Sequence, residues 1–369
     1  MPRTYVFSVP IGPAHVDRLL QTLKSLAAQP VPVKVALCDA SGSAKCKAIA
    51  DQFPDLIAYR RHGPDKGQSD AINEGWREIK GDIYSWLNAD DYLAPNALAV
   101  VEQAFDTNPQ ADIVYGQSLI LEQDGTYIGL HPAVGPNIDL ISRSNIISQP
   151  SCFYKGELLE ALGPVKQELD YTMDWELWVR FYKNGKTFVY TPETLSTVLW
   201  ERGTKTSSVN QDRMREIREL TAQTHGPYVQ LKTMTGFYLH YFSEYSALAP
   251  IVGKLIGWCQ TRKMHRRSHW KAIPIEGLES DATSQMSKDR WCLKFYHYSD
   301  DPLREFVFNF FRPVSGTLRI NGTEHRLQHV RSIGVVVQDT EEKHFTLAFS
   351  GEQLVPENLD SIEPIFGTN

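Results

Sequence analysis

Two patterns of apolar and polar positions alternate along the first 120 residues. Short apolar runs are typical of buried strands, and they cover residues 5–9, 33–38, 56–59, 83–87 and the stretch from 113. Between them, apolar side chains recur at helical spacing over residues 16–28, 44–52, 69–80 and 96–105. Strands and helices that alternate at this distance predict an α/β fold, with a mostly parallel sheet flanked by helices.

From residue 209 onward the pattern changes. Residues 209–275 read as a charged and aromatic helical segment, and residues 276–288 as a polar linker. Residues 289–369 read as strands with hairpin turns, and Asn321-Gly322 between two alternating runs is a strong hairpin signal. We therefore expect an α/β domain over residues 1–208, a helical segment, and a small C-terminal β-rich module of sandwich type.

The composition is that of an ordinary globular protein, and a net charge of -6 gives no reason to expect a general nucleic-acid binder. Five scattered cysteines without Cys-x-x-Cys spacing favour reduced thiols and argue against a zinc site. The N-terminus carries no apolar leader, and no apolar stretch reaches the roughly 18 to 20 residues that a membrane helix needs. These features together predict a cytoplasmic protein.

A basic cluster runs from Arg262 to Lys271, with Trp258 and Trp270 nearby. Such a cluster could contact the anionic inner face of a membrane or a lipid-phosphate acceptor, which would make the protein peripheral to that membrane. A solvated basic helix face is the simpler alternative.

Asn88-Ala89-Asp90-Asp91 directly follows the apolar run over residues 83–87. Burying carboxylates without partners is costly, so packing does not explain two adjacent acids at this point. In parallel sheets, ligands bind at the carboxyl ends of strands. Hard oxygen ligands there could hold a divalent cation, and the cation could hold a diphosphate. The alternative is a solvated turn in which Asp90 caps the next helix.

Three further segments carry polar residues at strand ends or helix starts, where they could contact a ligand. Asp39 ends the second strand and could accept hydrogen bonds from a base edge. Residues 65–75 combine a flexible glycine, Gly67, with the cation Lys66. Asp174 opens a helix that the neighbouring tryptophans can anchor in the core. For each segment a capped helix or a charged loop is the alternative. A Gly-rich dinucleotide fingerprint and a P-loop are both absent, which disfavours hydride transfer and ATP hydrolysis.

In this order the four segments resemble a family 2 glycosyltransferase of GT-A fold, over roughly residues 4–208. The resemblance rests on Asp39, on the Lys-Gly-x-Ser-x-Ala-x-Asn-x-Gly segment 66–75, on Asn88 to Asp91, and on the Met-Asp-Trp-Glu run around Asp174. It implies a metal-dependent, inverting glycosyltransferase of hexosyltransferase type that uses Mn²⁺ or Mg²⁺. The expected donor is a nucleoside-diphosphate sugar, foremost a UDP-sugar, and the expected acceptor is a hydroxyl of a glycan or lipid-linked glycan.

The resemblance also implies roles for single residues. Asp174 matches the catalytic base, and Asp91, with Asp90 beside it, matches the metal ligands. The residues that match the nucleotide-sugar site are Pro10, Asp39, Lys66, Gly67, Asn73, Asn88 and Asp90. The residues expected on the acceptor side are Gln149, Pro150 and Trp175.

The sequence departs from the family pattern in two places. Asn88 stands where the acidic signature usually begins with Asp. The loop after the last strand of the domain usually carries a His, and here it reads Trp-Glu-Arg-Gly-Thr-Lys from Trp200 to Lys205. Glu201 could replace the missing His as a metal ligand. Arg202 and Lys205 could neutralise the diphosphate.

Two other functions stay open at this point. A nucleotidyltransferase would need a Gly-rich, basic first loop, and residues 10–15 do not form one. A non-catalytic sugar- or polysaccharide-binding protein could have kept the same scaffold. The presence of both Asp91 and Asp174 argues against that second alternative.

Overall fold

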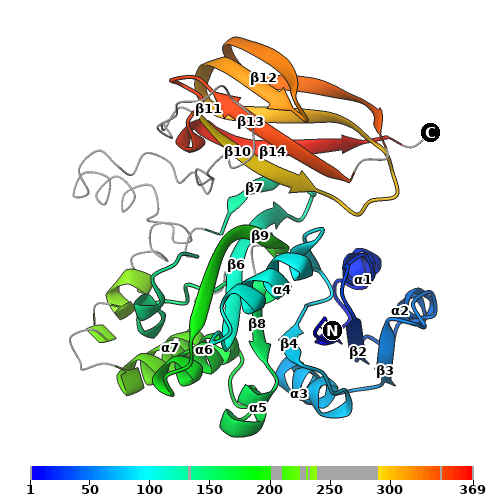
Figure 1. Ribbon diagram of the computed structural model, residues 1–369, viewed down its shortest axis with the longest axis vertical. Helices are drawn as coiled ribbons and strands as arrows, with labels where there is room; N and C mark the ends of the chain where they lie inside the picture. Colours follow the sequence, from blue (N-terminus) through cyan, green and yellow to red (C-terminus); the bar gives the residue numbers. More distant parts are fainter. Residues whose placement is uncertain are drawn as a thin grey trace.

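The computed structural model in Figure 1 describes residues 2–131, 134–200, 210–224, 230–231, 233–238, 290–340 and 343–367. Glu201, Arg202 and Lys205 lie outside these residues, and so does the basic cluster from Arg262 to Lys271. Most of the expected helical segment 209–275 also lies outside them. In the parts of the chain that are described, no helix combines the length and apolar character needed to cross a membrane.

Four parallel strands form the core of the N-terminal half. Their order in the sheet is β3-β2-β1-β4, and they are β1 (Tyr5–Ile11), β2 (Val33–Asp39), β3 (Ile57–His62) and β4 (Ile83–Trp86). The register pairs Ile11 with Asp39 and Asp39 with His62, so the carboxyl ends of three strands lie level. The parallel core that the alternating pattern predicts is confirmed.

Beyond β4 the sheet becomes mixed. The strand β8 (Cys152–Lys155) is antiparallel to both β4 and β6 (Ile113–Glu122). A tight turn at Gly125 leads from β6 into β7 (Tyr127–Leu130). The two strands are antiparallel, because a turn this short cannot make the crossover that parallel strands need. The long strand β9 (Phe188–Trp200) pairs in parallel with β6 and antiparallel with β5 (Tyr92–Leu93). The expectation of a mostly parallel sheet therefore holds for β1 to β4 and for the pair of β6 with β9, while the other pairs are antiparallel.

Helices cover both faces of this sheet (Figure 1). Tyr5, Phe7 and Val9 of β1 belong to one hydrophobic cluster, whereas Val6 belongs to another, as expected for a strand whose side chains alternate. The first cluster contains residues of α1 (Leu19–Ala27), α2 (Ala44–Ala50) and α4 (Ala97–Thr107). The second contains residues of α3 (Gln68–Glu78), α5 (Glu157–Leu162), α6 (Met173–Lys183) and α7 (Gln211–Thr224).

Short 3₁₀ helices connect several of these elements. They are η1 (Val16–Arg18), η2 (Ile138–Ser142), η3 (Gln149–Ser151) and η4 (Pro356–Asn358). The four cysteines in the described ranges are free and buried.

The C-terminal strands are all antiparallel. They are β10 (Arg290–Tyr296), β11 (Leu303–Ile320), β12 (Thr323–Thr340), β13 (His344–Ser350) and β14 (Leu359–Phe366). The predicted hairpin is confirmed, because Asn321 and Gly322 join β11 to β12 with φ of 47° and 87°. Two expected runs merge into the single strand β11, whose register shifts between Asn309 and Gly316. The sandwich packing of this module stays a prediction.

The C-terminal strands are joined directly to the N-terminal half (Figure 1). Ile362 of β14 pairs with Tyr127 of β7, and the hydroxyl of Tyr127 donates a hydrogen bond to the carbonyl oxygen of Tyr296 at 2.8 Å. One hydrophobic cluster runs from β1 through β7 into β10 and β11. The two halves therefore share a core instead of meeting only through a linker.

Candidate active site

The acid turn, Asn88 to Asp91, lies between β4 and β5 at the carboxyl edge of the parallel core. Asp91 is only 5% exposed. Its Oδ1 accepts a hydrogen bond from the backbone N–H of Leu199 at 3.2 Å, and its Oδ2 accepts one from Nδ2 of Asn88 at 3.0 Å. Gln68 Nε2 in turn donates to Asn88 Oδ1 at 2.8 Å. Asn88 therefore orients the buried acid, while α3 orients Asn88.

The electrostatics of this turn favour a cation. Burial raises the pKa of Asp91 well above its usual range, and repulsion from Asp90 raises it further. The hydrogen bonds from Leu199 and Asn88 oppose that rise. The side chain of Asp90 is 17% exposed, and His15 Nδ1 lies 3.6 Å from its carboxylate. Adjacent carboxylate oxygens are ligands that Mg²⁺ and Mn²⁺ accept, so the two acids fit a divalent ion that also binds a diphosphate.

The described residues contain no group of three His, Cys, Asp or Glu side chains able to hold a metal ion. The third ligand expected from the sequence, Glu201, lies outside them. Asp90 and Asp91 are thus the two adjacent carboxylates that the acid turn itself offers, and a diphosphate would supply further oxygens.

A second polar group stands at the end of β2, on the other side of β1 from β4. Asp39 is 1% exposed and accepts hydrogen bonds from the backbone and the hydroxyl of Ser41, while His62 Nδ1 lies 2.6 Å from its Oδ2. Burial opposes ionisation, but the bonds from Ser41 and His62 outweigh it and hold the pKa of Asp39 below its usual range. Pro10, buried at the end of β1, pairs with the residue before Asp39.

His62 was not anticipated from the sequence. It closes β3, whose strand character is visible in the sequence, but its pairing with Asp39 depends on the register between β2 and β3. The only available signal was that both residues end neighbouring strands.

The Lys66–Gly75 segment divides into two parts. Lys66 and Gly67 are exposed before α3, and Gly67 has φ of 118°, which favours glycine. Asn73 instead turns toward a later segment, since its Nδ2 donates to the carbonyl oxygen of Val165 at 2.8 Å. A Cβ on Gly75 would lie 2.4 Å from Ser8 Oγ, so this glycine permits close packing of α3 on β1. The expected contact of Asn73 with a nucleotide stays a prediction.

Asp174 lies in the first turn of α6, and its carboxylate is half-buried. Oδ1 accepts a hydrogen bond from the backbone N–H of Trp175 at 2.7 Å, and Oδ2 accepts one from Asn145 Nδ2 at 2.8 Å. Burial raises the pKa of Asp174, and these two hydrogen bonds oppose the rise. The carboxyl group is therefore a stronger base than an exposed aspartate, and its orientation is fixed.

Aromatic packing holds α6 against the strand that leads into the acid turn. The ring of Trp178 stacks on that of Trp86 in β4, with the ring centroids 5.9 Å apart. Ser69 of α3 donates from its hydroxyl to Met173 Sδ at 2.9 Å. Trp175, Trp178 and Val179 are all at most 3% exposed, which confirms the predicted anchoring of this helix.

The residues expected on the acceptor side are buried or bound to backbone carbonyl groups. Gln149 Nε2 donates to the carbonyl oxygen of Trp86 at 2.7 Å, and Pro150 is buried. Trp175 is 3% exposed, and its indole N–H donates to the carbonyl oxygen of Ile141. In this arrangement the three side chains support the site, and contact with an acceptor stays a prediction for them.

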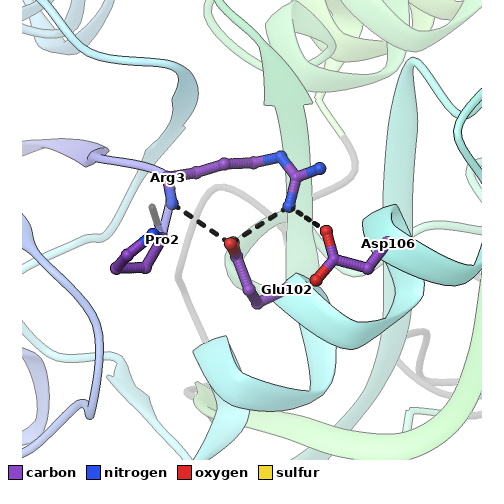
Figure 2. Close-up of a pocket in the computed structure, with 4 residues that line it drawn as sticks. All are labelled: Pro2, Arg3, Glu102 and Asp106. Carbon is purple, nitrogen blue, oxygen red and sulfur yellow. Dashed lines mark hydrogen bonds and ion pairs between the residues drawn. The ribbon is translucent and has the colours of Figure 1, made fainter.

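A separate small hollow lies at the amino end of the sheet (Figure 2). It is lined by Pro2, Arg3, Glu102 and Asp106, and Arg3 bridges the two acids at 3.1 Å and 2.8 Å. Because these residues precede β1 or lie on α4, the hollow is at the opposite edge of the sheet from the acid turn. It takes no part in the candidate site.

A parallel core with acids at its carboxyl edge, followed by an aspartate at a helix start, is the arrangement that the resemblance to GT-A transferases leads us to expect. Residues 15–155 match the model of Glycosyl transferase family 2, and this part of the chain is a domain of that family. A curated relative, an uncharacterized glycosyltransferase of Rickettsia typhi, is 21% identical over 48% of this chain and 58% of its own length. The chain therefore spans little more than half of that relative.

One solved structure supports the fold, and a second is a weaker match. The chain resembles S. aureus TarS 1–349 in complex with UDP-GlcNAc, with a TM-score of 0.51 and 15% identity, over 71% of this chain and 76% of that one. The mannosyltransferase PcManGT from Pyrobaculum calidifontis, in complex with GDP-Man and Mn²⁺, is 17% identical over 70% of this chain and 80% of its own, with a TM-score of 0.46.

Proposed function

We propose that this protein is a metal-dependent glycosyltransferase, with residues 1–208 as its catalytic domain. It would transfer a sugar from a nucleoside-diphosphate sugar to an acceptor hydroxyl, with inversion at the anomeric carbon. One observation carries most of the proposal. The first two residues of α3 reach both acidic elements, because Gln68 binds Asn88 of the acid turn and Ser69 binds Met173, the residue before Asp174. The proposed donor site and the proposed base would thus lie against one helix start.

The donor that we expect is a UDP-sugar. TarS, which shares the fold, has been solved with UDP-GlcNAc. The buried Asp39 at the end of β2 offers an ionised oxygen to the N–H of a base, and the bonds from Ser41 and His62 keep it ionised. The acceptor that we expect is a glycan or lipid-linked glycan, as in the family that the sequence resembles.

Asp91 and Asp90 would hold the Mn²⁺ or Mg²⁺ ion. When bound, the ion supplies Lewis-acid stabilisation of the departing nucleoside diphosphate. Asn88 and the backbone N–H of Leu199 fix the Asp91 carboxylate, so its position does not depend on the ion. Exposed Lys66 lies before the same helix start and is available to balance phosphate charge.

Asp174 would take the proton of the acceptor hydroxyl as that oxygen attacks the anomeric carbon from the face opposite the leaving group. Its raised pKa makes it a better proton acceptor, provided that it is ionised at the working pH. Asn145 and the N–H of Trp175 hold the carboxylate in one orientation. Holding base and substrates in line supplies much of the rate.

Calorimetric titration of UDP, GDP, CDP and dTDP, each with and without Mn²⁺, tests the proposal. We expect one nucleotide to bind far more tightly when the metal is present, and the matching nucleotide sugar to release nucleoside diphosphate on incubation with the enzyme and an acceptor. Failure of every nucleotide to bind, with or without metal, would contradict the proposal and favour a non-catalytic binding protein on the same scaffold.

A further inference from the structure

One buried carboxylate from α7 holds the segment that leads into α6. Glu216 is 5% exposed. Its Oε1 accepts a hydrogen bond from the backbone N–H of Asp170 at 3.0 Å. Its Oε2 accepts from the backbone N–H of Tyr171 and of Thr172, both at 2.9 Å, and from the Thr172 hydroxyl at 3.0 Å. A single side chain thus satisfies three consecutive amides.

These amides directly precede the helix that carries Asp174. The first N–H groups of a helix have no partner within the helix and favour negative charge. Thr172 is the N-cap of α6, and its own side chain makes no capping hydrogen bond to the helix. Glu216, 44 residues further along the chain, instead binds the N–H and the hydroxyl of this N-cap residue and the two amides before it.

Contacts with α3 hold the residues just before this segment. Asn73 of α3 binds the carbonyl oxygen of Val165, and Gln167 Nε2 donates to Asp70 at 2.9 Å. Later turns of α6 have separate anchors, since Arg180 donates to the carbonyl oxygens of Gly163 and Pro164. Loss of Glu216 would therefore loosen the first turn of α6 and leave the rest of the helix in place.

We propose that Glu216 is a positioning residue that fixes Asp174 for proton transfer. Asp174 lies two residues after Thr172, so the amides that Glu216 binds set the direction of the chain at the base. The proposal rests on the proposed function, in which Asp174 is that base. It gives α7, which follows the family-matched residues 15–155, a part in the reaction.

The test compares Glu216→Gln and Glu216→Ala with the wild type. Gln keeps one oxygen acceptor but sets an NH₂ group against backbone N–H donors, whereas Ala removes every bond. Glu219→Gln, an exposed glutamate on the same helix, is the matched control. Two readouts are used on the full chain. Amide hydrogen exchange follows peptides that cover residues 168–175, and steady-state kinetics give kcat and the KM of the donor, measured as nucleoside diphosphate release.

We expect faster exchange at residues 170–172 in both Glu216 variants, with Ala above Gln and the control unchanged. Displacing a base by about 1 Å can cost on the order of 100-fold in rate, so kcat should fall by about 10- to 100-fold while the donor KM changes less than about twofold. Thermal unfolding of each variant shows whether it is folded. If Glu216→Ala does not fold, Glu216→Gln, which keeps one oxygen acceptor, carries the test.

Unchanged exchange in both variants would overturn the contact itself. Faster exchange with an unchanged kcat would overturn the positioning role, because Glu216 would then have a structural role only. A parallel loss of kcat and donor affinity would also contradict it, since donor binding does not depend on Asp174. If the wild type itself released no nucleoside diphosphate from any nucleotide sugar, the proposed function would fail, and the exchange readout would still decide whether Glu216 holds the segment.

Discussion

Asn145 Nδ2 lies 2.8 Å from Asp174 Oδ2 and donates a hydrogen bond to it, which joins the loop after η2 to the first turn of α6. This bond stabilises the ionised form of Asp174, whereas burial disfavours that form. The balance between the two effects sets the pH below which Asp174 can no longer act as a base.

The pH profile of Asn145→Ala tests this balance. Burial raises the pKa of Asp174, so transfer by the wild type should fall with decreasing pH through a value above the usual aspartate range. Removing the Asn145 bond takes away support for the charged form, so the acid limb should move to higher pH. Asn184→Ala, at the exposed far end of the same helix, should leave the limb in place. An acid limb that is identical in wild type and Asn145→Ala would contradict the assignment of that limb to Asp174.

Asp91→Ala should remove the metal-dependent part of nucleotide binding. Loss of residues that only support a metal ligand already costs about 10- to 100-fold in affinity, so loss of a direct ligand should cost at least as much. Calorimetric titration with and without Mn²⁺ measures the effect, and exposed Asp55→Ala is the control. Undiminished metal-dependent binding would remove Asp91 from the metal site.

Asp39→Ala should weaken nucleotide binding whether or not metal is present. A hydrogen bond to a charged group contributes about 1.5–3 kcal/mol, so we expect a loss of tenfold or more. The contrast with Asp91→Ala separates base recognition from diphosphate binding in the same titrations. If the loss appeared only with Mn²⁺, Asp39 would belong to the metal-dependent contacts and not to the base.

The junction between the two halves of the protein should be costly to disturb. Tyr127 is 2% exposed, and its hydroxyl contacts Tyr92 at 2.8 Å and the carbonyl oxygen of Tyr296 at 2.8 Å. Tyr127→Phe leaves these buried groups without that partner, which should lower the free energy of unfolding by about 1–3 kcal/mol.

Chemical denaturation measures this change in the free energy of unfolding. Tyr238→Phe serves as the control, because Tyr238 is 45% exposed. Equal stability of the two variants would show that the hydroxyl network contributes nothing to the junction.

The sequence was most informative where the structure depends on local pattern. The strands β1 to β4 follow from their apolar runs, and the hairpin at Asn321-Gly322 follows from turn chemistry. The sequence predicts that the acids at the strand ends lie at one edge, because parallel strands have their carboxyl ends together. Asp39 and Asp91 lie at that edge, and their roles in binding stay predictions.

Contacts between distant segments could not be read in the same way. The partner of Asp174, Asn145, is 29 residues away, and no periodicity marks it. The antiparallel course of β8 depends on its pairing with β4 and β6, which its four-residue pattern does not encode. Asn73 sits in a recognisable motif, but the direction of its side chain is set by Val165 from another loop. Tertiary packing, and not the local sequence pattern, determines these side-chain partners and strand directions.

The most direct test of the account is nucleoside diphosphate release by Asp174→Asn, measured beside donor affinity. The substitution keeps the shape of the side chain and removes the ability to take a proton. The account predicts that transfer is abolished, that the donor binds as tightly as to the wild type, and that exposed Asp212→Asn behaves as the wild type. Wild-type transfer by Asp174→Asn would contradict the account, because the reaction would then need a base other than Asp174.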